Sequence, residues 1–284
     1  MRVLAILVGF LFWNLENFFA EPDASRSWTR SRFYTKANAV AKTILWSADE
    51  NGEPPAVIGL AEVDSREVLS RMLGSTILRK FDYGIVHFDS PDPRGIDVAL
   101  LYRKDRLHPV SARSVHVRDS CGAVIPTRDI LVVELEGEIP RTAVLVNHHP
   151  SKYGGRASAP RRLAAMRTLC SVVDSLKAAG VDRIVAMGDF NDTPDAEPFR
   201  LLEGRLKDFN RHGEGSIRFG GKWELIDLFY ACGVEGEVRV LNPPFLTERD
   251  NVHVGDRPLR TYTGPGYRGG VSDHRPVLFS ISRF

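Results

Sequence analysis

Residues 183–192 read RIVAMGDFND, an apolar run that passes abruptly into polar residues. Short runs rich in Val and Ile and bounded by turn residues are typical of buried strands. Asp189 and Asn191 therefore follow a predicted strand, where it enters a loop at the edge of a sheet. A single Asp or Asn in that position is usually a turn or helix-capping residue. Taken alone, the stretch predicts a strand and leaves the function open.

The same pattern recurs along the chain. Further apolar runs that predict strands lie at Val3–Phe12, Ala56–Ala61, Gly84–Phe88, Ile96–Tyr102, Ile130–Leu135, Ala143–Asn147, Leu225–Tyr230, Val238–Leu241 and Pro276–Ile281. Apolar residues at helical spacing predict helices over Arg32–Trp46, Ser65–Leu73 and Ala159–Ala178. Strands interleaved with helices predict packed sheets with helices on the outside.

The composition is that of a folded protein. Of the 284 residues, 43% are hydrophobic and 26% are charged, which excludes collagen, coiled coils and global disorder. No internal repeat or long linker interrupts the chain, so we expect a single domain over residues 1–284. The 38 Lys and Arg residues against 36 Asp and Glu give a net charge of +2, too small to predict wholesale binding of nucleic acid or anionic membranes. Any preference for phosphate must come from a local site.

The N-terminus and the cysteines bear on the cellular compartment. Residues 3–13 form an apolar run that is too short to span a membrane and could be either a secretory signal or a buried first strand. The strand-like character continues to Phe19 and no A-x-A pattern precedes Ala20, so we favour the strand, a cytoplasmic location over export, and no integral membrane association. The 3 cysteines include no CxxC pair and predict neither a zinc site nor a disulfide framework.

Polar side chains stand at the ends of several predicted strands. They are Asn14, Glu62, Asp97, His148, Asp189, Asn191, Asp227, Asp273 and His274. Turn formation and capping explain each one singly, but not the repetition of oxygen and imidazole groups. Carboxylate and amide oxygens suit a hard cation such as Mg²⁺ or Mn²⁺ better than zinc, and imidazole transfers protons near neutral pH. Such a set is suited to phosphoester hydrolysis.

Five segments in a fixed order carry a resemblance to a known family. They are WNLEN (13–17), GLAEV (59–63), VNH (146–148), GDFND (188–192) and GVSDHRP (270–276). Together they resemble the endonuclease/exonuclease/phosphatase superfamily, which includes deoxyribonucleases, abasic-site endonucleases, inositol polyphosphate phosphatases and bacterial sphingomyelinases. The resemblance implies an α/β four-layer sandwich, in which two mostly antiparallel β-sheets pack face to face with helices on the outside. It also implies an active site at one edge of the packed sheets.

The resemblance further implies roles for the matching residues. Glu62 corresponds to the metal-binding glutamate, with Asn14 and Asp273 beside the metal. Asp189 and Asn191 are implied to lie against the scissile phosphate and the attacking water. The expected cofactor is Mg²⁺ or Mn²⁺, as one or two ions.

The two predicted catalytic histidines each need a carboxylate to orient the ring. The resemblance implies that Asp227 orients His274. For the other histidine we favour His148 over its neighbour His149, and we pair it with Asp97, because an acid that begins an apolar strand is costly unless it is partnered.

Three further residues are candidates for substrate binding. Arg94 could hold a phosphate oxygen or be an exposed turn residue, and Tyr267 could stack on a base or sugar or pack on the rim of the sandwich. Arg156 belongs to a segment, residues 152–167, that contains basic residues and no acid. This segment is either a solvated helix face or a rim that attracts a polyanion.

These observations predict a metal-dependent phosphoesterase, and the basic segment favours a nuclease that cuts phosphodiesters of nucleic acid. The alternative is a phosphatase or phosphodiesterase acting on inositol phosphates, phospholipid head groups or other small phosphoesters. The sequence offers no obvious aromatic-tipped insertion for membrane contact, which disfavours a lipid substrate. A non-catalytic binding module is a remote alternative, because every key residue is intact. We expect the protein to be a monomer.

Overall fold

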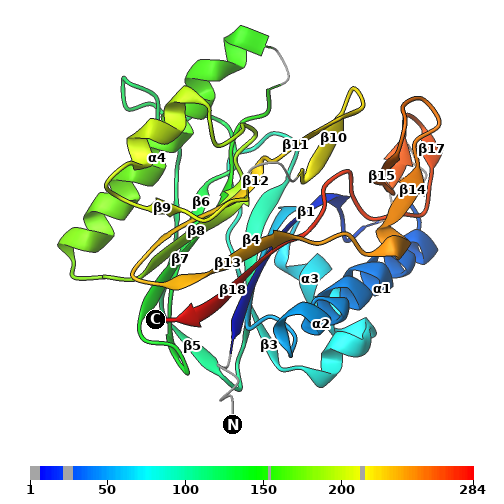
Figure 1. The fold of residues 1–284 in the computed structure, drawn as a ribbon, viewed down its shortest axis with the longest axis horizontal. Helices are drawn as coiled ribbons and strands as arrows, with labels where there is room; N and C mark the ends of the chain where they lie inside the picture. The colour runs from blue at the N-terminus through cyan, green and yellow to red at the C-terminus, as the bar shows by residue number, and fades with distance from the viewer. Residues whose placement is uncertain (1–6, 22–27, 153–154, 212–214) are drawn as a thin grey trace.

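The computed structural model describes residues 7–21, 28–152, 155–211 and 215–284, and its core is a pair of six-stranded sheets (Figure 1). The first sheet has the order β13 (Glu235–Val240), β18 (Val277–Arg283), β1 (Val8–Phe18), β2 (Val57–Val63), β4 (Asp97–Arg103) and β3 (Tyr83–His87). The second sheet has the order β5 (Leu107–Val115), β6 (Ile130–Gly137), β7 (Thr142–His148), β8 (Ile184–Asp189), β12 (Asp227–Cys232) and β9 (Lys207–Asp208).

Helices flank the sheets, and short hairpins extend from one edge. The helices are α1 (Arg30–Trp46), α2 (Ala48–Asn51), α3 (Arg66–Ser75) and α4 (Ala159–Ala178), with 3-10 turns η2 (Ile77–Lys80), η3 (Gly155–Ser158), η4 (Glu197–Leu202) and η5 (Pro244–Leu246). The hairpins are β10 (Ile217–Phe219) with β11 (Lys222–Glu224), β14 (Thr247–Arg249) with β15 (Asp256–Pro258), and β16 (Tyr262–Thr263) with β17 (Gly266–Tyr267).

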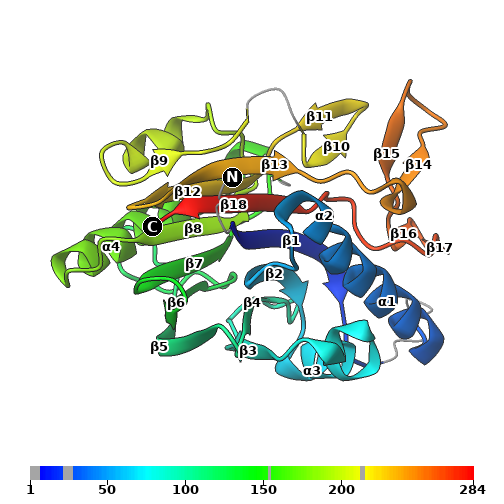
Figure 2. The same ribbon diagram turned by 60° about the horizontal axis from the view of Figure 1, so that its bottom comes forward.

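Alternation along β1 shows how the layers form. Phe10 and Phe12 point into the core between the two sheets, whereas Leu11 and Trp13 point into a second core against α1 and α3. Successive side chains of a strand face opposite sides, so β1 is buried on both faces. A third core lies between the second sheet and α4. Figure 2 shows α4 on one outer side and α1 with α3 on the other, so the predicted four-layer sandwich is confirmed.

Two pairs of neighbouring strands run parallel and position the site. All other neighbours in the two large sheets are antiparallel, but β1 pairs with β2 and β7 pairs with β8 in parallel. Parallel neighbours end at the same edge of a sheet. Asn14 lies opposite Ala61, next to Glu62, and His148 lies opposite Asp189. The strand order therefore gathers the predicted polar residues at one edge.

The predicted elements agree with the structure apart from some boundaries, one missed long strand, and the missed short strands β9, β10, β11 and β14 to β17. The helix predicted over Ala159–Ala178 is found with those bounds. The first strand begins at Val8 within the described residues and continues to Phe18, while residues 1–6 lie outside them. The missed long strand is β5, an edge strand that contains Pro109 and is largely exposed, so its sequence lacks an apolar run. Within the described part of the chain, no helix is long and apolar enough to cross a membrane.

Candidate active site

Among the described residues, four other than glycine adopt left-handed backbone angles, and all four lie in the motif segments. Glu16 has φ 49°, Asn17 has φ 55°, Glu62 has φ 61° and Asn191 has φ 51°. Such conformations are uncommon outside glycine, cost about 1–3 kcal/mol each, and cluster at functional sites. Glu16 and Asn17 lie near the end of β1, where its pairing with β2 shifts register between Asn14 and Phe18. Glu62 is the penultimate residue of β2, and Asn191 follows the end of β8.

Asp189 lies at the centre of the converging side chains. Its Oδ2 accepts a hydrogen bond from Asn14 Nδ2 at 3.0 Å and lies 3.5 Å from His148 Nε2 and 3.8 Å from His274 Nε2. Its Oδ1 accepts from the backbone N–H of Asn191 at 2.9 Å. Burial raises the pKa of this carboxyl to about 7, although the neighbouring His274 acts in the opposite direction.

His274 and Asp227 form the predicted pair. The distance from His274 Nδ1 to Asp227 Oδ2 is 2.7 Å, and the aspartate is fully buried. Burial lowers the pKa of His274, but the charges of Asp227 and Asp189 outweigh it and hold the pKa well above its usual value. The backbone of His274 is fixed separately, because its carbonyl accepts from Trp13 Nε1 at 2.9 Å and its N–H donates to Ser272 Oγ at 3.0 Å.

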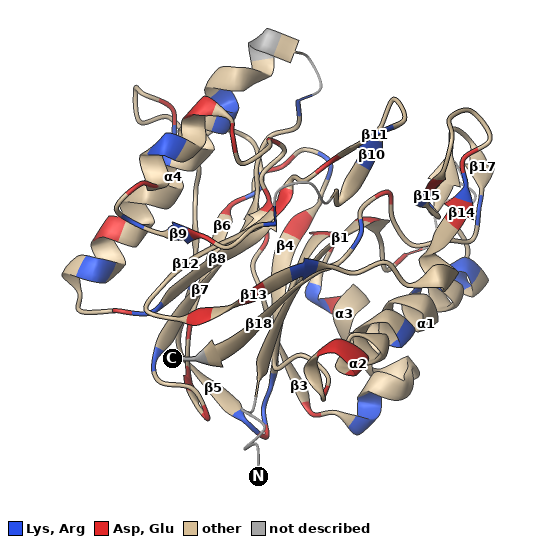
Figure 3. Cartoon of the chain, viewed as in Figure 1, with Lys and Arg blue, Asp and Glu red and all other residues tan. Residues whose placement is uncertain are grey.

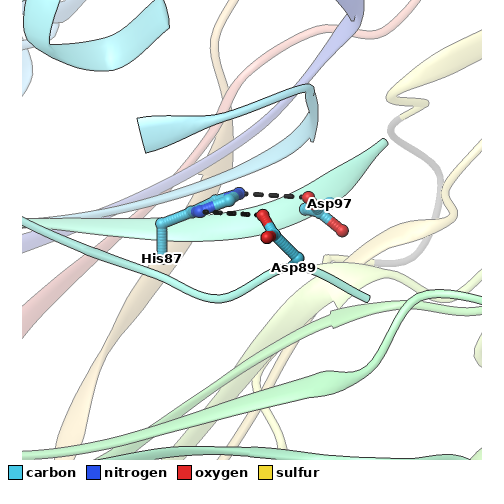
Figure 4. A group of neighbouring side chains, drawn as sticks. All are labelled: His87, Asp89 and Asp97. Atoms are coloured by element: carbon cyan, nitrogen blue, oxygen red, sulfur yellow. Dashed lines mark hydrogen bonds and ion pairs between the residues drawn. The ribbon is translucent and has the colours of Figure 1, made fainter. Parts of the chain in front are cut away.

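The predicted pairing of His148 with Asp97 is wrong. Asp97 lies 3.1 Å from Nε2 of a different histidine, His87, and its other oxygen accepts from the N–H and hydroxyl of Ser90 (Figure 4). The physical reason is strand order, since β3, which ends at His87, is the neighbour of β4 in the first sheet, whereas His148 ends β7 in the second. The cluster in Figure 4 also includes Asp89, whose Oδ1 is 3.9 Å from His87 Nδ1.

His148 itself lies within the site, without an orienting acid. Its Nε2 is 3.5 Å from Asp189 Oδ2 and 3.9 Å from Glu62 Oε1, while its buried Nδ1 has no hydrogen-bond partner among the described residues. Burial and the positive charges of Arg128 and Arg94 lower the pKa of His148 well below its usual value. At a pH between the two pKa values, His148 is therefore neutral while His274 is protonated.

The oxygen donors fit a hard divalent cation. Glu62 Oε2 accepts the N–H of Asn17 at 2.9 Å, which leaves Oε1 near His148, and Asp273 Oδ1 lies 3.9 Å from His274 Nε2. Carboxylate oxygens suit Mg²⁺ or Mn²⁺, because these hard cations prefer oxygen ligands to sulfur or to several imidazoles. A tighter group of Asp189, Asp227 and His274 has ligand atoms within 4.8 Å of one another. In that group the hydrogen bond between His274 and Asp227 accounts for the close approach without an ion.

Two predicted polar residues are already engaged by protein groups. Asn14 Oδ1 accepts the N–H of Glu16 at 2.9 Å, so both ends of the Asn14 amide are used and it orients Asp189. Asn191 Nδ2 donates to the carbonyl of His149 at 3.0 Å. His149 lies fully buried beside Phe190, with ring centroids 4.8 Å apart, and burial lowers its pKa to about 3.

The predicted substrate-binding residues have different surroundings. Arg94 is 49% exposed, and its Nε donates to Asp92 Oδ1 at 3.2 Å. Tyr267 packs on the rim, 5.6 Å from the ring of Tyr262 and under the guanidinium of Arg32 at 4.1 Å. The side chain of Arg156 lies outside the described residues.

The segment 152–167 is partly neutralised by acids. Arg162 and Lys152 both form ion pairs with Asp192, at 3.3 and 3.2 Å. Arg161 donates to the carbonyl of Pro126 and, like Arg167, is exposed. Figure 3, coloured by residue type, shows basic residues along the upper half of α4.

Two buried cations escaped the sequence analysis. The Arg128 side chain is 4% exposed, pairs with Asp92 Oδ2 at 2.9 Å and donates to the carbonyl of His149. Lys36, in α1, is fully buried. A lysine or arginine in an otherwise ordinary segment carries no sequence signal that it is buried, so neither residue could have been singled out.

The expectation that the chain lacks an aromatic-tipped insertion is wrong. Phe219, at the turn between β10 and β11, is 78% exposed, and Val252 and Val254, between β14 and β15, are 77% and 99% exposed. The two hairpins touch, because Arg218 Nη2 donates to the carbonyl of Val254 at 2.6 Å. In Figures 1 and 2 their tips lie side by side. A single phenylalanine in a polar segment does not predict an exposed apolar hairpin tip.

The comparisons with known proteins agree with this geometry. The sequence profile of the Endonuclease/Exonuclease/phosphatase family matches residues 14–283, and a search of curated proteins finds no match. A mannosyl-6-phosphatase from Bacteroides thetaiotaomicron VPI-5482 is similar in structure, with TM-score 0.66 and 17% identity over 96% of this chain and 99% of that chain. The human Nocturnin catalytic domain with bound sulfate gives TM-score 0.62 and 16% identity over 99% and 96%. Truncated Caenorhabditis elegans TDP2 gives 0.59 and 16% over 97% and 97%. At these identities the likeness concerns the fold.

Proposed function

The chain belongs to the Endonuclease/Exonuclease/phosphatase family, and we propose that it is a divalent-metal-dependent phosphoesterase that cuts phosphodiester bonds of nucleic acid. The observation that carries the proposal is the position of the Asp189 carboxylate. Its Oδ2 lies 3.5 Å from Nε2 of His148, whose pKa burial lowers, and 3.8 Å from Nε2 of His274, whose pKa is raised because the charges of Asp227 and Asp189 outweigh burial. A carboxylate between two imidazoles of opposite protonation state is suited to moving a proton during hydrolysis.

The metal would be held by Glu62 and Asp273, whose carboxylates face the same group of side chains. When bound, Mg²⁺ or Mn²⁺ supplies Lewis-acid polarisation of a phosphoryl oxygen. Asn14 fixes the orientation of Asp189 through the 3.0 Å hydrogen bond, so that Oδ2 can accept a proton from water. Asp227 fixes the His274 ring with Nε2 directed into the site, where it can donate a proton or stabilise negative charge.

The choice of nucleic acid among phosphoesters rests on the exposed cations near this edge. Arg94 is half-exposed and close enough to His148 to lower its pKa. Arg161 and Arg167 are exposed on the first half of α4, the helix that follows the loop after His148. Exposed arginines on one side of a catalytic edge attract an extended polyanion more than a small monoester.

The test is a hydrolysis screen with purified protein in Mg²⁺, in Mn²⁺ and in EDTA. The substrates are plasmid DNA, RNA, abasic duplex, bis-p-nitrophenyl phosphate, inositol phosphates and sphingomyelin vesicles. We expect metal-dependent cleavage of DNA or RNA that is lost in Asp189→Asn. The exposed Asp174 on α4 provides a matched control, since Asp174→Asn removes the same charge away from the site. Full activity of Asp189→Asn, or no cleavage of any phosphodiester, would contradict the proposal.

One observation favours a second candidate, a phosphodiesterase acting on lipid head groups. Phe219, Val252 and Val254 form an exposed apolar patch on two hairpin tips, and such patches mark interaction surfaces. The patch is linked to the site, because Ile217 in β10 forms a β-bridge with His274. Faster hydrolysis of sphingomyelin vesicles than of DNA, reduced in Phe219→Ser, would favour this candidate over the nuclease.

A further inference from the structure

Lys36 is a fully buried lysine directly beneath the catalytic edge. Its Nζ donates two hydrogen bonds, to the carbonyl of Glu16 and to Thr261 Oγ1, both at 2.8 Å. The ammonium also lies 5.6 Å from the ring centroid of Phe18 and 5.9 Å from that of Trp28. Burying a charge is costly unless it is paired and hydrogen-bonded, so the surroundings of Lys36 must compensate for that cost.

The first hydrogen bond holds a strained turn that presents two site residues. Glu16 and its neighbour Asn17 have φ 49° and 55°. Within this turn the N–H of Glu16 donates to Asn14 Oδ1, and the N–H of Asn17 donates to Glu62 Oε2, both at 2.9 Å. Fixing the Glu16 carbonyl therefore also fixes the N–H groups that orient Asn14 and Glu62.

The second hydrogen bond holds the loop that leads to the catalytic histidine. Thr261 Oγ1 accepts from Lys36 and donates to the carbonyl of Val271 at 2.7 Å, and the Thr261 N–H donates to Glu16 Oε2 at 3.1 Å. Val271 precedes Asp273 by two residues in the sequence. Lys36 thus joins α1 to the Glu16–Asn17 turn near the end of β1 and to the loop before Asp273.

The charge of Lys36 is balanced by the acids of the site. Burial lowers the pKa of the Lys36 ammonium to about 8, and the negative charges of Glu16, Glu62 and Asp273 act in the opposite direction. Arg260 adds a second cation, since its Nη2 lies 2.7 Å from Glu16 Oε1 and 3.1 Å from Asp273 Oδ2. Asp273, one of the two proposed metal ligands, therefore forms an ion pair with a protein cation.

We propose that Lys36 is a positioning residue of the active site, which holds the Glu16–Asn17 turn and the 261–271 loop so that Glu62 and Asp273 present a preformed metal-binding edge. The inference rests on the proposed function, because it assumes that the site uses a metal to hydrolyse phosphoesters. The hydrogen bonds of Lys36 bear on metal binding alone, so metal affinity tests them independently of the reaction. Partners that orient metal ligands typically contribute 10- to 100-fold in metal affinity or activity. A merely structural lysine would contribute to stability and leave both quantities unchanged in the folded protein.

The experiment compares two substitutions and their matched controls. Lys36→Met keeps the chain volume and removes the donors and the charge, and Lys42→Met makes the same change at an exposed position of the same helix. Thr261→Val removes the hydroxyl with nearly the same shape, and Thr261→Ser restores it. For each protein we would measure thermal unfolding, Mn²⁺ affinity by titration calorimetry well below the unfolding temperature, and kcat and KM for bis-p-nitrophenyl phosphate.

We expect Lys36→Met and Thr261→Val to weaken Mn²⁺ binding by about 10-fold or more and to lower kcat more than they raise KM. Lys42→Met and Thr261→Ser should stay within about twofold of the original protein. Wild-type affinity and kcat in a folded Lys36→Met or Thr261→Val would overturn the inference. If Lys36→Met does not fold, the two Thr261 variants decide. If the original protein binds Mn²⁺ but hydrolyses no phosphoester, the proposed function fails while the affinity comparison still tests Lys36.

Discussion

Replacing Asp227 by Asn isolates the contribution of one buried charge to the catalytic histidine. The side chain is fully buried and its Oδ2 lies 2.7 Å from His274 Nδ1, so the substitution preserves shape and removes the charge. The histidine backbone is held by Trp13 and Ser272 and does not depend on Asp227 for its place. We therefore expect His274 to stay in position and to lose its protonation and orientation.

The size of the effect follows from the geometry. Two unit charges about 4 Å apart in an effective dielectric of about 20 interact by about 4 kcal/mol, which sets an upper limit near 10³-fold in rate. A charge-assisted hydrogen bond contributes about 1.5–3 kcal/mol, which sets a lower limit near 10-fold. We expect kcat to fall by about 100-fold with less than about a threefold change in KM, because the pair acts on the reacting atoms and not on substrate binding.

The assay combines kinetics with a titration of the ring. NMR of the His274 imidazole should show a lower pKa in Asp227→Asn, because the acid that raises it has lost its charge. His274→Ala and the double variant complete a cycle, and the double variant should be only slightly slower than His274→Ala. Losses that multiply as independent factors, or an unchanged His274 titration in a folded variant, would refute the pairing as a functional unit.

Three other variants test separate parts of the structure. Glu62→Gln should abolish turnover and weaken Mn²⁺ binding while leaving the unfolding temperature nearly unchanged; wild-type rates at limiting Mg²⁺ would remove Glu62 from the site. Asp92→Asn should lower the free energy of unfolding in urea at pH 7 by about 3 kcal/mol, because it leaves the buried Arg128 without its carboxylate. Burial raises the pKa of Asp92, but the hydrogen bonds from Arg128 and from the backbone of Arg94 outweigh it and hold the folded pKa below the unfolded value of 3.8. This contribution is therefore present above pH 4 and is lost as the pH falls through the folded pKa; a difference that does not shrink at all as the pH is lowered from 7 would argue against it. Arg156→Glu with Arg161→Glu should weaken binding of long polyanions and flatten its salt dependence, with little effect on bis-p-nitrophenyl phosphate, whereas equal losses on both would mean that the segment supports the fold.

Most of the site residues could be predicted because they end strands. A buried strand has a strong apolar signature, and a carboxylate or imidazole just after it can lie only at the sheet edge. Asp227 and Asp189 illustrate this, since they begin and end neighbouring antiparallel strands and face each other in register. The sequence locates such residues along the chain, and closure of the fold brings them together.

The partner of an individual side chain depends on strand order, which local pattern does not encode. The sequence pairs Asp97 with His148 because an acid that begins an apolar strand is costly without a partner, yet β3 lies beside β4 and gives Asp97 a different histidine. Arg128 and Lys36 were missed for a related reason. Their burial results from contacts with residues distant in sequence, such as Asp92 and Thr261, that no local pattern links to them.

The backbone strain at the site shows why local rules fail where function is concentrated. Propensity favours glycine or asparagine at left-handed positions, and Asn17 and Asn191 follow that preference, but Glu16 and Glu62 do not. Each glutamate is stabilised by interactions that glycine could not make. Glu16 binds Arg260 and Thr261, and Glu62 accepts the N–H of Asn17 while its other oxygen faces the site. The conformational cost is therefore offset by polar contacts that hold the carboxylates in place, and a preformed site needs less reorganisation when it binds its ligand.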